Sequence, residues 1–287
     1  MDKYIDLHVH STVSDGTYTP CELVKYASEK KLAAIALTDH DCIFGIEEAK
    51  ECAKKYDIEV ISGIEFSTKY KDTEIHILGL YIDETNEDFI KNLDYIVKSR
   101  ELRNEKMIQK LNDHGLNITM KDVLDNSDSD VYTRAHFAKA LYNKGYVKSL
   151  REAFDKYIGN DCPCYVSREK VTPKLAIDLI RSCKGVPILA HPTLYNMDLR
   201  QLDVLIKELV ADGLLGIEGL YSLYNKSEVR YIGDFAKKYN LLISGGSDFH
   251  GNNKVNIDLG IGRGNLKIPY SILEKIKLRR KEVYELD

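Results

Sequence analysis

Several features that define other protein classes are missing from this 287-residue chain. It contains no tryptophan, no cysteine pair with CxxC spacing, and no apolar run near the roughly 20 residues that a membrane helix needs. Its first residues, MDKYIDLHVH, lack the pattern of a secretory signal peptide. We therefore expect a cytoplasmic enzyme without a transmembrane segment, whose six cysteines are reduced thiols.

The chain also lacks a surplus of positive charge. It has 41 Lys and Arg against 45 Asp and Glu, a formal net charge of −4. A long nucleic-acid duplex is not expected as a partner, since proteins that bind one usually carry a basic face. A small anionic substrate is compatible with this charge, because bound metal ions can be the largest local charges in a site.

Short runs rich in β-branched residues alternate with amphipathic helical stretches over most of the chain. Seven strands are predicted, at residues 4–10, 33–38, 60–65, 75–81, 186–192, 214–221 and 241–248. Helices predicted between most of them are typical of parallel βαβ units in an α/β fold. A barrel or a strongly curled parallel sheet is the natural closure.

The middle of the chain differs, because residues 86–159 show only helical periodicity. Helices are predicted at 87–112, 120–124, 134–144 and 150–157, with an exposed loop at 125–130. We interpret residues 1–99 and 161–287 as a catalytic barrel, and residues 100–160 as a small all-helical insertion that covers the substrate.

Side chains that bind metal ions recur around the ends of the predicted strands. They are His8, His10, Asp15, His40, Glu65, His76, His191, Asp248 and His250. His8 and His10 share one face of a strand, because side chains two apart point the same way. In parallel α/β folds, sites form where strands end. Only His76 lies away from the end of its predicted strand, between two isoleucines, where a lone histidine is more often a core residue.

Imidazole and carboxylate ligands without thiolate favour Mn²⁺, Zn²⁺ or Fe²⁺. Nine ligands exceed the needs of one ion, so two or three ions are predicted, with Glu65 as the natural bridge. Such clusters stabilise the attacking and leaving oxygens of phosphoryl transfer. Ser11, Ser67 and Ser247 lie beside ligands, but none forms a nucleophile elbow, so a serine-hydrolase mechanism is excluded.

Five motifs carry a family resemblance. DLHVHS (6–11), TDHD (38–41), GIEFS (63–67), LAHP (189–192) and GSDFHG (246–251) resemble those of the PHP (polymerase and histidinol phosphatase) superfamily. The resemblance implies a distorted seven-stranded β/α barrel with three metal subsites. It implies the following sets: His8, His10, Glu65 and Asp248; Glu65, His76 and His191; Asp15, His40 and His250.

The sequence of the helical insertion indicates a subgroup within this superfamily. TRAHFAKAL (133–141) and the following segments look like the trinuclear 3′,5′-nucleoside bisphosphate phosphatases, which also trim short oligoribonucleotides from the 5′ end. Substrate contacts are expected from Arg134, whose planar fork suits phosphate, and from His136. Glu218 is expected either to touch the substrate or to support a ligand. Ala135 replaces a proline common in this subgroup, and residues 216–225 lack a histidine that relatives often show.

We therefore predict hydrolysis of a phosphate monoester by a hydroxide that bridges metal ions, with Glu65, His191 and His250 as catalytic residues. Nucleoside 3′,5′-bisphosphates or short 5′-phosphorylated oligonucleotides are the expected substrates. One alternative is a phosphatase of another small metabolite, such as histidinol phosphate. The other is a catalytically silent module that binds partners, but such a module should have lost ligands, and this chain has lost none.

Overall fold

The structure is a computed structural model that describes residues 3–124, 132–166 and 171–286. The loop predicted at 125–130 lies outside these residues. Seven strands form one curled sheet in chain order. They are β1 (Tyr4–Val9), β2 (Leu32–Leu37), β3 (Glu59–Tyr70), β4 (Thr73–Leu80), β5 (Val186–Leu189), β6 (Gly216–Tyr221) and β7 (Leu242–Gly246).

The first and last strands meet, so the sheet closes nearly into a barrel. The backbone N–H of His10 donates to the carbonyl of Phe249 at 3.0 Å. Gly246 permits this approach, because a Cβ there would lie 2.2 Å from the Cβ of His8. Asp6 accepts hydrogen bonds from the backbone N–H groups of Ser247 and Gly260, and burial raises its pKa to about 6. The predicted seven-stranded β/α barrel is confirmed.

One strand runs against the expected direction. β4 pairs antiparallel with both β3 and β5, whereas the sequence predicted parallel units throughout. β3 also continues to Tyr70, so Glu65 lies in the middle of a strand and not at its end. A tight turn at Lys71, which has φ +52°, joins the two strands as a hairpin. The reversal brings the start of β4, with His76, to the same rim as the ends of the parallel strands.

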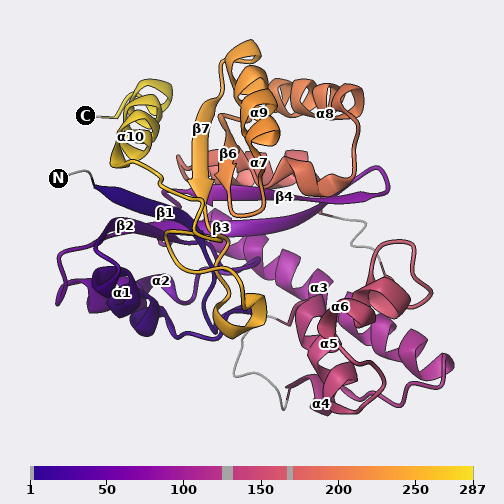
Figure 1. Ribbon diagram of the computed structural model, residues 1–287. Coiled ribbons are helices and arrows are strands. Elements are labelled where there is room, and N and C mark those ends of the chain that lie inside the picture. Colours follow the sequence, from indigo (N-terminus) through magenta and orange to yellow (C-terminus); the bar gives the residue numbers. More distant parts are fainter. Residues whose placement is uncertain (1–2, 125–131, 167–170, 287) are drawn as a thin grey trace.

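Helices cover the outside of the sheet (Figure 1). They are α1 (Pro20–Glu29), α2 (Ile46–Ala53), α7 (Pro173–Ser182), α8 (Leu199–Ala211), α9 (Lys226–Lys238) and α10 (Tyr270–Tyr284). α1 starts as the sequence predicts, because Thr19 and Glu22 form a reciprocal capping box. No helix among the described residues is long and apolar enough to cross a membrane.

A group of helices lies to one side of the barrel (Figure 1). It comprises α3 (Glu87–Asp113), α4 (Met120–Leu124), α5 (Arg134–Asn143), α6 (Leu150–Ala153) and the π-helical turn η1 (Phe154–Ile158). Met107 and Leu111 of α3 pack with Phe137 in a hydrophobic core separate from the barrel's. The first half of α3 packs on the barrel instead, through Phe89 and Leu93. We call α4, α5, α6, η1 and the second half of α3 the cap.

The expectation of six reduced thiols is wrong for one pair. Cys21 of α1 and Cys52 of α2 form a disulfide with Cα atoms 5.4 Å apart. The two helices lie side by side on the sheet, and this packing brings together residues 31 apart in the chain. No local spacing in the sequence reveals such a pair. The other four cysteines, Cys42, Cys162, Cys164 and Cys183, are free.

Candidate metal centre

All nine predicted ligands converge at one rim of the barrel. His8 lies on β1 and His10 just beyond it, while Glu65 and His76 come from the β3–β4 hairpin. The remaining five lie in the loops that follow β1, β2, β5 and β7; they are Asp15, His40, His191, Asp248 and His250. All nine except His76 are buried. The turns are tight, since His191 has φ +24° and Asp248 φ +57°. Such strained backbone clusters at functional sites.

Glu65 stands at the middle of the cluster. Its Oε1 lies 2.8 Å from Nδ1 of His76 and 3.0 Å from Nε2 of His191. Its Oε2 lies 3.2 Å from Nε2 of His8 and 3.1 Å from Nε2 of His10. Nδ1 of His40 also lies 3.3 Å from Oε2, so the two oxygens face different sets of imidazoles, which is the arrangement of a carboxylate that bridges ions.

Asp15 lies close to a second group of imidazoles. Its Oδ1 lies 3.2 Å from Nε2 of His250, and its Oδ2 lies 3.8 Å from Nε2 of His40. The hydroxyl of Thr133 in the cap donates to Oδ2 at 3.0 Å. Asp39 shapes the loop before Asp15, since it accepts hydrogen bonds from the Ser11 and Ser14 hydroxyls at 2.7 and 2.6 Å. Asp15 therefore joins the barrel rim to the cap.

Asp248 is held so that one oxygen faces the cluster. Oδ1 lies 3.5 Å from Nε2 of His8 and 3.4 Å from Nε2 of His10. Oδ2 accepts a hydrogen bond from the Tyr221 hydroxyl at 2.6 Å and pairs with Nζ of Lys254 at 2.5 Å. Tyr221 and Lys254 were not predicted from the sequence. Such outer contacts orient a carboxylate ligand and limit it to one free oxygen.

Glu218, predicted either to touch the substrate or to support a ligand, lies behind the cluster and does not line the cavity described below. Its side chain is fully buried. Oε1 lies 3.1 Å from Nδ1 of His8, and Oε2 accepts the backbone N–H of His191 at 2.8 Å. A hydrogen bond from Nδ1 of His8 leaves Nε2 to face the cluster. The geometry supports the other sequence-based alternative, in which Glu218 orients a ligand.

The close packing of imidazoles and carboxylates strongly shifts the pKa values of several side chains in the cluster. Burial would raise the pKa of Glu65, but His8 and neighbouring imidazoles hold it well below its usual range. Burial would lower the pKa of His8, but Glu65 and Glu218 raise it well above normal. Burial and the nearby His250 lower the pKa of His10. A proton and a cation compete for these nitrogens, so cation binding should weaken as the pH falls.

The donors fit divalent ions. Sets of three or four ligand atoms lie within 4.8 Å of one another, including His8, His10 and Asp248 as one set, and His10, Asp15, His40 and His250 as another. Within the described part of the chain, the buried Nδ1 atoms of His10, His40 and His191 have no hydrogen-bond partner. Imidazole and carboxylate donors at this density suit Mn²⁺, Zn²⁺ or Fe²⁺.

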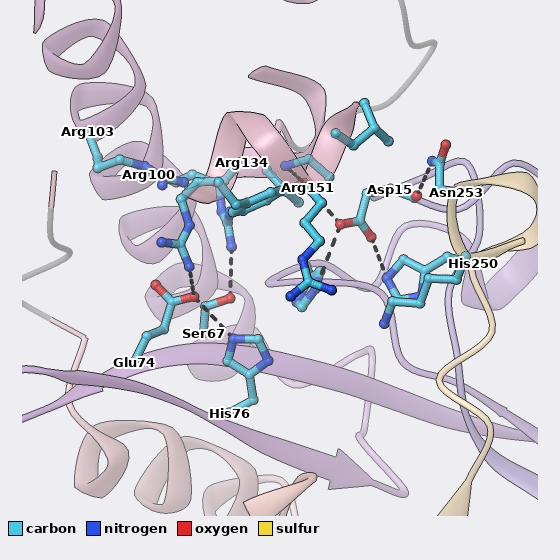
Figure 2. A pocket seen from close by; sticks show the side chains of 16 residues that line it. Asp15, Ser67, Glu74, His76, Arg100, Arg103, Arg134, Arg151, His250 and Asn253 are labelled. Carbon is cyan, nitrogen blue, oxygen red and sulfur yellow. Dashed lines mark hydrogen bonds and ion pairs between the residues drawn. The ribbon is translucent and has the colours of Figure 1, made fainter. Parts of the chain in front are cut away.

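A cavity of about 340 Å³ opens from the cluster toward the cap (Figure 2). Asp15, His40, His76 and His250 face it from the barrel side. Four arginines also line it: Arg100, Arg103, Arg134 and Arg151. The cavity therefore places several positive side chains opposite the candidate ligands, which suits a substrate with more than one anionic group.

Of the predicted substrate residues, Arg134 lines this cavity. Its Nη2 donates to Oε1 of Glu74 at 2.7 Å, and its Nη1 donates to Oδ1 of Asn160 at 3.1 Å. His136 does not line the cavity: its Nδ1 accepts the backbone N–H of Thr133 at 2.9 Å. His136 thus holds the residue whose hydroxyl reaches Asp15, and its contact with substrate stays a prediction.

Arg100 and Arg103 were missed, although the sequence carries a signal for them. They occupy the buried stripe of α3 that Phe89, Leu93 and Ile96 begin, at the spacing where apolar residues are expected. Arg100 pairs with Asp41 and donates to the Ser67 hydroxyl at 3.2 Å. A buried arginine at a core position indicates an anionic neighbour, because a buried charge must be paired.

Comparison with known proteins agrees with this fold and site. A 5′-3′ exoribonuclease of Haemophilus influenzae is 37% identical, over 87% of this chain and 91% of the relative. A 3′,5′-nucleoside bisphosphate phosphatase of Chromobacterium violaceum is 33% identical, over 89% and 90%. A solved structure of an amidohydrolase from Chromobacterium violaceum, with bound sulfate and no metal, has a TM-score of 0.86 at 31% identity and covers 96% of both chains.

The barrel, its rim of imidazoles and carboxylates, and these relatives define a metal-dependent phosphoesterase. This class confirms the enzymatic activity predicted from the sequence. The chain belongs to the PHP domain family, whose model matches residues 6–160. The resemblance carried by the five motifs is thereby confirmed.

Proposed function

We propose that this phosphoesterase removes phosphate from nucleoside 3′,5′-bisphosphates or from the 5′ end of short oligonucleotides. The observation that carries the proposal is the cavity that joins the metal-ligand cluster to the arginines of α3 and the cap. A substrate with two anionic groups can place one at the cluster and the other against the arginines. Of the two curated relatives described above, one is named a 3′,5′-nucleoside bisphosphate phosphatase and the other a 5′-3′ exoribonuclease, so both names refer to nucleotide or RNA substrates.

Three divalent ions, Mn²⁺, Zn²⁺ or Fe²⁺, are part of the proposal. The first would bind His8, His10, Glu65 and Asp248; the second Glu65, His76 and His191; the third Asp15, His40 and His250. The two oxygens of Glu65 support the first two sets, since each faces different imidazoles. The contacts of Asp15 with His40 and His250 support the third.

When bound, such ions lower the pKa of water and neutralise charge that develops on phosphate. The protein supplies orientation and shielding. Glu65, His191 and His250 are the proposed catalytic residues. Of the two histidines, His250 lines the cavity and His191 does not, so His250 is the better placed to meet the leaving oxygen. The cap excludes water from one side and presents Arg134 to the remote part of the substrate.

The domain division is a further part of the proposal. Residues 1–99 and 161–287 would form the catalytic barrel, and residues 100–160 the cap that decides which substrate enters. The separate hydrophobic core around Met107 and Phe137 supports this division. Because α3 packs on both cores, the cap should move little relative to the barrel near Arg100.

We also propose a cytoplasmic location, which the four free cysteines support. The bond between Cys21 and Cys52 is uncommon in that compartment. Thiol labelling of protein purified from cells under conditions that trap thiols would test this point. Four labelled cysteines would show that the bond between Cys21 and Cys52 is present in the cell, and cell fractionation that finds the chain outside the cytoplasm would refute the proposed location.

Phosphate release from a panel of substrates tests the proposed activity. Protein loaded with Mn²⁺ would be given 3′-phosphoadenosine 5′-phosphate, AMP, histidinol phosphate and a 5′-phosphorylated trinucleotide. We expect the bisphosphate or the trinucleotide to be cleaved with the highest kcat/KM. Activity on histidinol phosphate alone would refute the nucleotide assignment. Release from no substrate, with less than one metal ion per chain, would instead favour a catalytically silent module.

A further inference from the structure

Glu74 occupies a position that neither the family motifs nor the proposed ligand sets include. It lies on β4 two residues before His76, so both side chains point to the same face of the hairpin. Its side chain is 18% exposed and lines the cavity between the barrel and the cap. A carboxylate beside an anionic substrate weakens substrate binding, because like charges repel, unless contacts with other side chains compensate.

One oxygen of Glu74 connects the two sides of the cavity (Figure 2). Oε1 accepts a hydrogen bond from Nη2 of Arg134 at 2.7 Å and lies 3.3 Å from Nε2 of His76. On the other edge of the ring, Nδ1 of His76 lies 2.8 Å from Oε1 of Glu65. A continuous chain of polar contacts thus runs from the centre of the ligand cluster to the cap.

The contact with His76 determines which ring nitrogen is available to an ion. A hydrogen atom on Nε2 that points to Glu74 leaves the lone pair on Nδ1, the atom that faces Glu65. Carboxylates commonly orient histidine ligands in this manner. His76 is also the least buried of the nine candidate ligands, so an external support matters most for this ring.

The contact with Arg134 determines where the guanidinium points. The cap holds the other side of this group, through Asn160 and through the rings of Phe154 and Tyr165, whose centroids are 5.8 and 5.3 Å away. Among the described residues, Glu74 is the acidic side chain that forms an ion pair with Arg134. Without it, the guanidinium loses its anchor on the barrel.

We propose that Glu74 is a positioning residue that orients both the metal ligand His76 and Arg134, the side chain of the cap that binds the substrate. The inference rests on the proposed function, since it assigns metal binding to His76 and substrate binding to Arg134. In this role Glu74 acts through its contacts with His76 and Arg134. Its effect is to make cation binding at the rim and substrate binding at the cap depend on one carboxylate.

The variant Glu74→Gln keeps the size of the side chain and removes its charge. We expect a 10- to 100-fold loss of Mn²⁺ affinity, the usual effect of removing such a support, measured by titration with a metal indicator. KM for the best panel substrate should rise about 10-fold, with a smaller change in kcat at saturating metal. Glu152→Gln is the matched control, because Glu152 pairs with Lys156 in the cap and does not itself line the cavity. It should behave as wild type.

A double-mutant cycle separates positioning from simple structural support. If Glu74 acts on substrate through Arg134, adding Glu74→Gln to Arg134→Gln should raise KM no further. Additive effects on KM would overturn the coupling, as would an unchanged Mn²⁺ affinity in Glu74→Gln. The metal titration needs no substrate, so it tests Glu74 even if wild-type protein releases phosphate from none of the panel. Circular dichroism would confirm that each variant is folded.

Discussion

Replacing Glu218 tests whether carboxylates behind the cluster control cation binding. Glu218 is fully buried, lies 3.1 Å from Nδ1 of His8 and accepts the backbone N–H of His191 at 2.8 Å. Glutamine has the same size but only one acceptor oxygen. In Glu218→Gln, the amide NH₂ must therefore face one of two N–H donors, and one hydrogen bond is lost.

The size of the effect follows from that lost bond. A hydrogen bond to a charged group contributes about 1.5–3 kcal/mol, and every 1.4 kcal/mol is about tenfold in an equilibrium constant. We expect cation affinity to fall about 10- to 100-fold, which agrees with the usual cost of removing a carboxylate behind a histidine ligand. The phosphate-release rate at limiting metal should fall by a similar factor and recover partly when metal is added.

The assay compares apparent Mn²⁺ dissociation constants of wild type, Glu218→Gln and the control Glu274→Gln. Glu274 is exposed on α10 and should have no effect. Melting temperatures would show that the variants are folded. A folded Glu218→Gln protein with wild-type Mn²⁺ affinity and wild-type rate would refute the reasoning, because the orientation of His8 would then not depend on Glu218.

Three further outcomes are expected. Removing metal with a chelator should lower the melting temperature by roughly 5–10 °C, since one ion at 100 times its Kd stabilises by about 2.7 kcal/mol; unchanged melting on a calorimeter would contradict this. Dithiothreitol should lower the melting temperature of wild type but not of Cys21→Ser, because chain entropy assigns about 3–4 kcal/mol to a bond across 31 residues. The hydrogen bond from Lys144, and to a smaller extent those from Thr119, lower the pKa of Asp122 from 3.8 to about 2. The charged carboxylate therefore stabilises the cap above pH 4, and this stabilisation is lost as the pH falls toward 2. Urea unfolding should show Asp122→Asn less stable than wild type at pH 6, with the gap closing near pH 2.

The sequence predicts most of the barrel because local signals agree with one another. The capping box of Thr19 and Glu22 and the alternation of apolar strands with amphipathic helices are local features. The reversal of β4 was missed, although the chain shows it. Only nine residues separate Glu65 from Ile75, and a parallel crossover needs a dozen or more. The direction of β4 could therefore be predicted from the length of the connection, and not from the types of its residues.

The ligand cluster was predicted more fully than its surroundings. His and Asp at strand ends can be recognised from the chain alone, whereas the support of Asp248 by Tyr221 and Lys254 depends on how β6 and the loop after β7 pack. The same holds for Glu74, which no motif includes. The contact of His136 with the start of its own helix was likewise not predicted, because the sequence alone does not show that this ring is buried.

The antiparallel pairing of β4 with β5 has a consequence for how this enzyme class can diversify. Parallel neighbours must be joined by a crossover of restricted hand and length, but antiparallel neighbours accept a connection of almost any length. Residues 81–185 connect β4 to β5, and this long connection contains the whole cap. Segments of other lengths could replace the cap at this junction without disturbing the pairing of the sheet. New substrate ranges could therefore arise by exchanging a single module while the reaction centre is inherited unchanged.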